Sequence, residues 1–405
     1  MESGLNKPAD RTTRRGFMAG AATMAAGVLG GCKSGAERGV PTSAPSTAGF
    51  PTRPLGRCGL RIPILQQGGD YYCSARLIGR CLELGVRAFD TAENYAQRKG
   101  EVFLGSSLAK LKVNRESILL ATKAYVKHPR DILTRHVPES LRRLQTDYID
   151  IWYLHDLSQP EVLSSPDWKA AAEELKQSGQ AKCFGVSCHN DRLIAVMNAA
   201  VRCGWVDVIM LRYNFRSYGD RALNEAIDAC HRAGIGLIAM KTQASAVSFA
   251  ERLDPFRKTG YNRHQAVLKA VWQDGRIAAI VSAMPTVRMV EENAAAAYGR
   301  LSAAERKLLR DYAAATAGAY CPGGCGGCRC ECQAAVGTSL AVADILRLAM
   351  YHNTYGRRAD ARRLFREMPS YRRSLDGADL QAAQRACPNG LALTSLLPAA
   401  MDTLA

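Results

Sequence analysis

Short apolar runs rich in β-branched and aromatic residues recur between residues 62 and 284, and segments with helical spacing of apolar residues separate them. Residues 75–85 and 264–271 are two of these segments, with apolar side chains at i, i+3 and i+4. The runs predict strands at residues 62–68, 86–92, 118–124, 148–155, 183–189, 206–214, 235–241 and 277–284. Because strands buried on both faces are apolar almost throughout, the pattern predicts an α/β fold with a parallel sheet covered by helices.

Eight strand–helix units fit a (β/α)8 TIM barrel, which typically takes about 250 residues. The alternative is a doubly wound open sheet, which usually has fewer units and a glycine fingerprint after its first strand. Here the first predicted strand runs into Gly68 and Gly69 without the G-x-G-x-x-G spacing. The sequence therefore favours the barrel.

Ionisable residues lie at the ends of three consecutive predicted strands. Asp90 ends the second strand and Tyr95 follows in the loop, while Lys123 ends the third strand and His155 ends the fourth. The carboxyl ends of barrel strands meet at one mouth, so these four side chains should lie close together. The alternatives are that Asp90 caps the next helix, that Lys123 is solvated and that His155 is a satisfied core histidine.

At these positions the chain resembles the aldo/keto reductase superfamily. The matching segments are FDTAENYAQRKGEVFLGSSL (89–108), LLATK (119–123) and DYIDIWYLH (147–155), and RPLGRCGLRIP (53–63) is similar to the hairpin that closes the base of those barrels. The resemblance implies a barrel domain over residues 52–315. It also implies hydride transfer between NADP or NAD and an aldehyde, ketone or sugar, with Tyr95 as the acid/base. We expect Lys123 to lower the Tyr95 pKa, Asp90 to hold the lysine and His155 to orient the substrate oxygen.

The same resemblance assigns cofactor-binding roles to Ser187, Tyr213, Lys241, Glu292 and Asn293. The chain departs from the family pattern at several positions: Cys188, His189 and Asn190 follow Ser187, Met210 replaces a glutamine, Met240 and Lys241 replace a stacking tyrosine, and Thr286 and Glu291 replace a lysine and an arginine. We expect Glu291 to repel a 2′-phosphate, although Arg288 lies nearby in sequence. The choice between NADP and NAD stays open.

Residues 1–31 have the layout of an export signal. Paired arginines, Arg14 and Arg15, precede 13 small and apolar residues, too few to span a bilayer. The arginine pair resembles the twin-arginine signal, and Leu29-Gly30-Gly31-Cys32 resembles a lipobox that would anchor Cys32 to a membrane surface. Residues 32–51, rich in Pro, Ser, Gly and Ala, predict a flexible tether. The alternative is a buried helix with an incidental arginine pair.

The C-terminal residues 316–405 predict a small helical metal domain. Five cysteines fall within residues 321–332, and Cys387 is followed by proline, as in ferredoxin motifs. This pattern predicts one 4Fe-4S cluster on Cys321, Cys325, Cys328 and Cys387, with Cys330 or Cys332 as substitutes. Segments 342–356 and 386–393 also resemble the iron–sulfur extension of some exported aldo/keto reductase homologues. A zinc site with four cysteine ligands and disulfides are the alternatives.

Composition narrows the function. The 405 residues are 47% hydrophobic, which excludes a disordered chain, and their formal net charge is +17. Seven arginines lie between residues 357 and 373. An exported protein meets no nucleic acid, so we interpret them as a solvated basic surface.

These features together predict an exported periplasmic oxidoreductase that acts on a small carbonyl compound or sugar. We expect its nicotinamide cofactor to be tightly held, because no free pool is expected outside the cytoplasm, and the cluster to serve a redox partner protein. The alternative is a non-enzymatic binding or electron-transfer protein on a retained barrel.

Overall fold

The computed structural model describes residues 49–190, 192–246, 256, 260–315, 321, 331–353 and 358–405. The predicted signal peptide, Cys32 and three of the clustered cysteines, Cys325, Cys328 and Cys330, lie outside the described residues.

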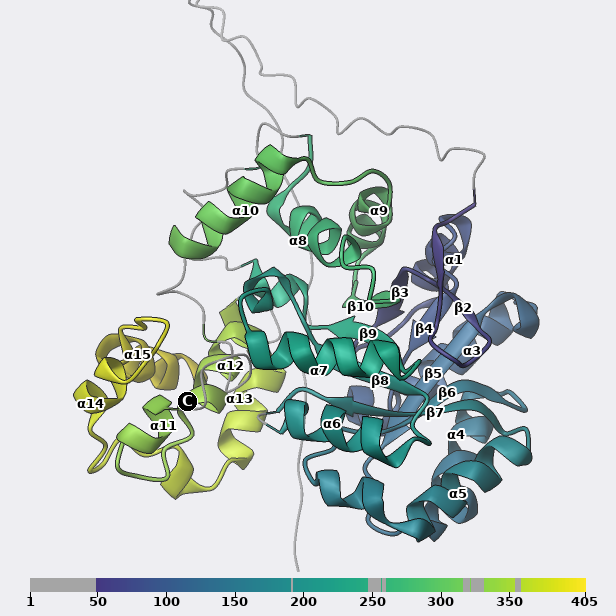
Figure 1. The fold of residues 1–405 in the computed structure, drawn as a ribbon, viewed down its shortest axis with the longest axis horizontal. Helices are drawn as coiled ribbons and strands as arrows, with labels where there is room; N and C mark the ends of the chain where they lie inside the picture. Colours follow the sequence, from purple (N-terminus) through teal and green to yellow (C-terminus); the bar gives the residue numbers. More distant parts are fainter. Residues whose placement is uncertain are drawn as a thin grey trace, which may run out of the picture. The chain divides into compact units, whose positions relative to one another are not determined.

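A closed barrel of eight parallel strands forms the larger part of the structure (Figure 1). Its strands are β3 (Leu65–Gly68), β4 (Ala88–Asp90), β5 (Leu119–Ala124), β6 (Ile149–Leu154), β7 (Ala181–Cys188), β8 (Val208–Arg212), β9 (Gly236–Met240) and β10 (Ala279–Ala283). Each strand pairs with its sequence neighbour, and β10 closes the barrel on β3. The prediction of a (β/α)8 barrel is therefore confirmed, and the open sheet is excluded.

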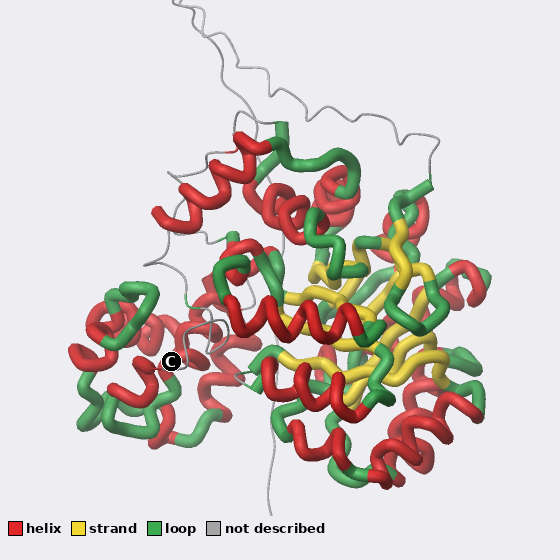
Figure 2. Tube along the Cα trace, viewed as in Figure 1, coloured by secondary structure: helices red, strands yellow, loops and turns green. Residues whose placement is uncertain are grey.

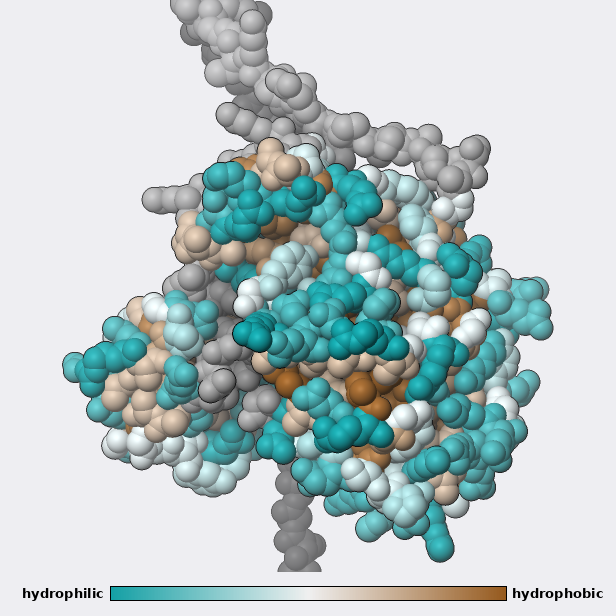
Figure 3. Space-filling view, in the orientation of Figure 1, coloured by the Kyte–Doolittle hydropathy of each residue, from teal (hydrophilic) through white to brown (hydrophobic). Residues whose placement is uncertain are grey.

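Helices follow every strand and cover the outside of the barrel (Figure 2). They are α1 (Ala75–Glu83), α2 (Tyr95–Arg98), α3 (Gly100–Lys110), α4 (Val137–Leu144), α5 (Pro166–Gln177), α6 (Leu193–Cys203), α7 (Arg221–Arg232), α8 (Arg263–Trp272) and α9 (Val287–Ala296). The outward side of α7 is hydrophilic in Figure 3, while its Leu223, Ile227 and Cys230 are buried. This division is what an amphipathic helix on a barrel requires.

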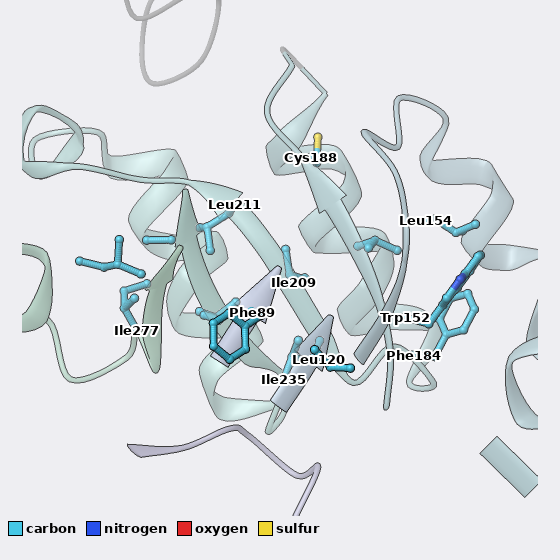
Figure 4. Packing of buried hydrophobic residues seen from close by; sticks show 14 of the residues in the cluster. Phe89, Leu120, Trp152, Leu154, Phe184, Cys188, Ile209, Leu211, Ile235 and Ile277 are labelled. Carbon is cyan, nitrogen blue, oxygen red and sulfur yellow. The ribbon is translucent and has the colours of Figure 1, made fainter. Parts of the chain in front are cut away.

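The main core lies between strands and helices. Figure 4 shows Trp152 of β6 against Phe184 of β7, two residues paired in register whose ring centroids are 5.6 Å apart. A second apolar cluster fills the barrel interior and includes Ile151, Tyr153 and Val208.

A short antiparallel hairpin, β1 (Thr52–Pro54) with β2 (Arg61–Pro63), packs Leu55 and Ile62 onto this interior cluster. The expected hairpin is thus present. It shortens the first predicted strand, because Pro63 has no N–H to give to the barrel ladder and β3 begins only at Leu65.

The described C-terminal part is helical. It consists of α11 (Glu331–Ala335), α12 (Val342–Asn353), α13 (Arg358–Glu367), α14 (Leu380–Arg385) and α15 (Leu393–Leu404), whereas α10 (Ala303–Ala315) packs Leu309 and Tyr312 against the barrel domain. From α11 onward these helices share a separate apolar core, which includes Ile345, Phe365 and Leu397. No helix among the described residues is long and apolar enough to cross a membrane.

Candidate active site

Four side chains predicted from strand ends meet at the carboxyl end of the barrel. Asp90 is the last residue of β4, Lys123 lies in β5, His155 follows β6 directly, and Tyr95 opens α2. The Lys123 Nζ lies 2.5 Å from the Asp90 Oδ1 and 4.8 Å from the Tyr95 ring centroid. The ring centroids of Tyr95 and His155 are 5.6 Å apart, edge to face. The four side chains therefore lie close together, as their positions at and after the strand ends predict.

Lys123 and Asp90 form a deeply buried ion pair. Their side chains are 2% and 3% exposed, and Lys123 also donates to the backbone oxygen of Thr91 across 2.7 Å. Burial lowers the pKa of Lys123 and raises the pKa of Asp90, and each shift is opposed by the charge of the other. The pair fixes the lysine ammonium beneath the Tyr95 ring.

The expectation that Lys123 lowers the Tyr95 pKa is wrong in direction. Burial raises the pKa of Tyr95 well above its usual value, and the carboxylates of Asp90 and Asp70 raise it further. The positive charge of Lys123 does not prevail, because Asp90 neutralises it at contact distance. Tyr95 is consequently held in its protonated form, which is the form that can donate a proton.

His155 is kept neutral by its surroundings. It is 8% exposed, and burial, together with the charges of Lys123 and Lys241, lowers its pKa to about 2. The ring of Tyr125 stacks on it with centroids 4.4 Å apart. Tyr125 was not predicted as a site residue, although it directly follows strand β5 and lies two residues after the matched segment 119–123.

The backbone after Tyr95 is strained. Ala96, Gln97 and Arg98 have φ of 48°, 56° and 67°, values in the left-handed region that non-glycine residues seldom adopt. The backbone N–H of Ala96 donates to the carboxylate of Asp70, a residue that the sequence analysis also missed. Strain of this kind is concentrated at functional sites, where surrounding contacts hold it in place.

Ser187 lies at the same mouth, near the end of β7. Its hydroxyl accepts from the backbone N–H of Asp156 at 2.9 Å and lies 3.4 Å from the backbone oxygen of Leu154. The Asn190 amide donates to the Asp156 Oδ1 at 3.1 Å. Ser187 and Asn190 thus both contact Asp156, in the loop after β6, although two residues separate them in the sequence.

Asn293 belongs to a closed polar network rather than to an open surface. Its amide donates to the Gln243 Oε1 and the Ser282 Oγ, both at 3.2 Å, and its oxygen accepts from the Gln243 Nε2 at 2.9 Å. Glu292, its neighbour on α9, accepts from Arg288 across 2.7 Å. Gln243 and Ser282 carry no sequence signal of their own, because the network joins Gln243, after β9, to Ser282 in β10 and Asn293 in α9.

Two other predicted cofactor residues face different partners. Tyr213 donates its hydroxyl to the Asp274 Oδ2 at 2.7 Å, in the segment before β10, so the structure does not place it with the four side chains described above. Lys241, directly after β9, contacts the hydroxyl of Tyr351 in α12.

Glu291 belongs to a small cluster of charged side chains. The Glu291 carboxylate is paired with Arg80 of α1 at 2.9 Å, and Arg80 also binds Glu83 at 2.8 Å. One arginine is thus shared by two carboxylates, and the expected repulsion of a 2′-phosphate by Glu291 stays a prediction.

The described cysteines of the C-terminal part share the helical core. Cys332 and Cys387 are buried there, and Cys321 packs against the same cluster half-buried. Cys332, which was expected only as a substitute ligand, thus shares this core with the predicted ligand Cys387. Within the described ranges no three His, Cys, Asp or Glu side chains are grouped closely enough to hold a metal ion.

The fold and these residues define an α/β barrel with buried Asp90, Lys123 and His155 and half-buried Tyr95 at its mouth. A model of the aldo/keto reductase family matches residues 70–305, more than half of the chain. The protein belongs to the aldo/keto reductase family.

Curated relatives match over parts of their length. L-galactose dehydrogenase from Arabidopsis thaliana is 30% identical over 202 residues, which is 48% of this chain and 60% of that protein. Methylglyoxal reductase DkgB from Salmonella typhi is 33% identical over 121 residues, which is 30% of this chain and 44% of that protein. The chain thus spans about half the length of these relatives.

Solved structures share the barrel. An aldo-keto reductase from Bacillus halodurans in its holo form has a TM-score of 0.54 and 24% identity, over 65% of this chain and 96% of that one. An aldo/keto reductase from Klebsiella pneumoniae in complex with NADP and acetate has a TM-score of 0.53 and 23% identity, over 63% and 93%. At these identities the likeness establishes the fold.

Proposed function

We propose that the protein is an oxidoreductase that transfers a hydride between a nicotinamide cofactor and the carbonyl of an aldehyde, ketone or sugar. The observation that carries this proposal is the convergence of Tyr95, Lys123, Asp90 and His155 from three successive strand–helix units on one mouth. A strained backbone beside the tyrosine supports the proposal, since strain of this kind marks functional segments.

The residues at the mouth fit a nicotinamide cofactor. Ser187 and Asn190 would hold its carboxamide, and the N-terminus of α9, with Arg288 84% exposed, would hold a phosphate, as helix N-termini do. When bound, the cofactor supplies the hydride.

Residues of the chain itself supply the proton that the substrate oxygen takes up during reduction. Tyr95 stays protonated because its pKa is raised, and it donates its hydroxyl proton to the substrate oxygen as negative charge develops there. The ammonium of Lys123 beneath the ring stabilises the phenolate that results. Neutral His155 orients the substrate oxygen by a hydrogen bond.

The replacement Tyr95→Phe tests this function. Removing the hydroxyl should lower kcat for NADPH- or NADH-dependent carbonyl reduction by at least about 100-fold, the usual contribution of a general acid. Tyr298→Phe, at a partly exposed tyrosine beside Phe50, is the control and should retain full activity. Unchanged turnover in Tyr95→Phe would leave the alternative, a binding or electron-transfer protein on a retained barrel.

The names of the relatives guide the choice of substrates. One is a dehydrogenase of L-galactose and another a reductase of methylglyoxal, so a first screen should pair hexoses with small dicarbonyl compounds. Each substrate should be assayed with both NADP(H) and NAD(H), in both directions.

The C-terminal part would hold one 4Fe-4S cluster and pass electrons to a partner. Support comes from the five cysteines within residues 321–332 and from the core shared by Cys332 and Cys387. Iron and acid-labile sulfide should each be near four per chain in anaerobically purified protein. Cys387→Ser should lower both, whereas the control Cys203→Ser, in the barrel, should not. If the purified protein holds zinc and no sulfide, the C-terminal part is a zinc site. If its cysteines are joined in disulfides, it holds no cluster.

Export by the twin-arginine route and a lipid on Cys32 complete the proposal. Support comes from Arg14, Arg15 and the short apolar stretch that follows them. Replacing both arginines by lysine should retain the protein in the cytoplasm. Cys32→Ser should release an exported protein from the membrane fraction, and a wild-type protein that is never exported would contradict this part.

A further inference from the structure

A tyrosine from the helical C-terminal part contacts the barrel mouth. The Nζ of Lys241, directly after β9, lies 2.5 Å from the hydroxyl of Tyr351 in α12 and 5.1 Å from the centre of its ring. Arg347, one helical turn before Tyr351, lies 5.8 Å from the same ring and is held by Asp344 at 2.7 Å. Tyr351 is therefore approached by a cation from the barrel and by another from its own helix.

Lys241 has an unfavourable backbone conformation. Its φ is 58°, in the left-handed region where glycine is the favoured residue. A lysine in this conformation carries backbone strain. The strained residue is the one whose ammonium contacts the Tyr351 hydroxyl.

Lys241 and Tyr351 are close enough to act electrostatically on the catalytic residues. The charge of Lys241 helps to lower the pKa of His155, and a charged Tyr351 would raise the pKa of Tyr95. Arg347 and Tyr351 also act on Tyr125, which stacks on His155. The Lys241–Tyr351 pair therefore lies close to Tyr95, Tyr125 and His155.

The chemistry beside the mouth suits a ligand with several hydroxyl groups. An ammonium, a phenol hydroxyl and a guanidinium offer donors and acceptors, and Tyr125 is 56% exposed, which leaves an aromatic surface next to them. Aromatic surface beside fixed polar groups matches a sugar, which has apolar C–H faces and polar edges. A small aldehyde without hydroxyl groups cannot form hydrogen bonds with these residues beyond the carbonyl oxygen.

We propose that Tyr351, positioned by Lys241, is a specificity-determining residue that binds the hydroxyl groups of a sugar substrate at the mouth of the barrel. This inference rests on the proposed carbonyl reduction and names the substrate class that the site selects. It assigns to the C-terminal part a role in substrate recognition that is separate from metal binding.

The kinetic test compares Tyr351→Phe with wild type on an aldohexose and on a small aldehyde without hydroxyl groups. Loss of one hydrogen bond should lower kcat/KM for the hexose about five- to tenfold, mainly through KM, and change the small aldehyde less than twofold. Tyr371→Phe, at a tyrosine of the same part that is 65% exposed, is the matched control. Equal effects on both substrates, or none on the hexose, would overturn the specificity role.

A spectroscopic titration checks the contact without enzyme activity. Burial raises the pKa of Tyr351, but Lys241 and Arg347 lower it to about 8, and Tyr95 and Tyr125 are the other tyrosines that interact with it. Tyrosinate absorbance of the intact protein should show a step near pH 8 that Tyr351→Phe removes and Tyr371→Phe retains. Lys241→Met should move the step to higher pH.

The two experiments separate the possible failures. Absence of carbonyl turnover by the wild-type protein with either nicotinamide defeats the proposed function, and the specificity role falls with it even if the titration step is present. Turnover without a titration step near pH 8 leaves the proposed function intact and overturns the arrangement of Tyr351 on Lys241.

Discussion

Lys123 donates a hydrogen bond from its Nζ to the Oδ1 of Asp90 across 2.5 Å, and neither side chain is more than 3% exposed. Breaking a buried pair leaves one charge without compensation, which typically costs about 3–5 kcal/mol. Asp90→Asn should therefore destabilise the barrel by an amount in that range, measured by urea unfolding. It should also lower kcat, because Lys123 is no longer held beneath Tyr95.

The matched control is Asp311→Asn. Asp311 pairs with Lys307 at 2.7 Å on α10, but both side chains are more than half exposed, and exposed pairs contribute about 0–1 kcal/mol. A loss of stability in Asp90→Asn no larger than in this control would mean that the buried pair is not ionised in the folded protein.

Burial of neutral His155 makes stability depend on pH. Its folded pKa of about 2 lies below the unfolded value of about 6.5, so the unfolded state binds the proton first as the pH falls. The stabilisation is present above about pH 6.5 and is lost below it, by up to about 1.4 kcal/mol for each pH unit. His155→Gln should reduce this slope between pH 6 and 4.5 in urea unfolding.

The same replacement at His231, which is exposed on α7, is the control and should keep the wild-type slope. His189 also contributes to that slope, because burial lowers its pKa as well, so the slope in His155→Gln should fall without disappearing. An unaltered slope in His155→Gln would show that this histidine is protonated in the folded protein.

The barrel could be predicted because its strands are buried on both faces, which makes each of them an uninterrupted apolar run. The runs around Ile151 and Ile209 are examples, since both side chains are fully buried in the structure. The start of the first strand could not be predicted from apolarity alone. Ile62 and Leu65 are equally buried, but one packs from the hairpin and the other from the barrel.

The positions of Asp90, Lys123 and His155 followed from strand ends, because parallel register brings those ends to one side. Two features of the site could not follow from sequence. One is the direction of the Tyr95 pKa shift. The charge of Lys123 alone would lower that pKa, but burial raises it and Asp90 offsets the lysine charge. The contact of Lys241 with Tyr351 joins residues 110 positions apart, from two separate cores.

Asn293 should be needed for stability as well as for cofactor binding. Asn293→Ala removes partners from the half-buried Gln243 and the buried Ser282, and each unsatisfied buried group typically costs about 1–3 kcal/mol. We expect a lower thermal midpoint, measured by circular dichroism, and weaker NADPH binding, measured by fluorescence. Asn198→Ala, on the exposed face of α6, should change neither. A drop in NADPH affinity with full stability would assign Asn293 to the cofactor alone.

Gly56, at the turn of the β1–β2 hairpin, should tolerate no side chain. Its φ is 52°, and a Cβ there would lie 2.3 Å from both the backbone oxygen of Gly234 and the backbone nitrogen of Gly236. Gly59, in the same hairpin, has a φ of 69° but open space around a Cβ, so it isolates the conformational cost. Gly59→Ala should lose about 1 kcal/mol, and Gly56→Ala should lose at least about 3 kcal/mol in urea unfolding, because backbone atoms cannot yield as a flexible side chain can. Since the hairpin closes the end of the barrel opposite the mouth, kcat of the folded fraction should be unchanged in both variants. Equal losses in the two variants would show that the hairpin moves freely away from Gly234 and does not hold the base of the barrel.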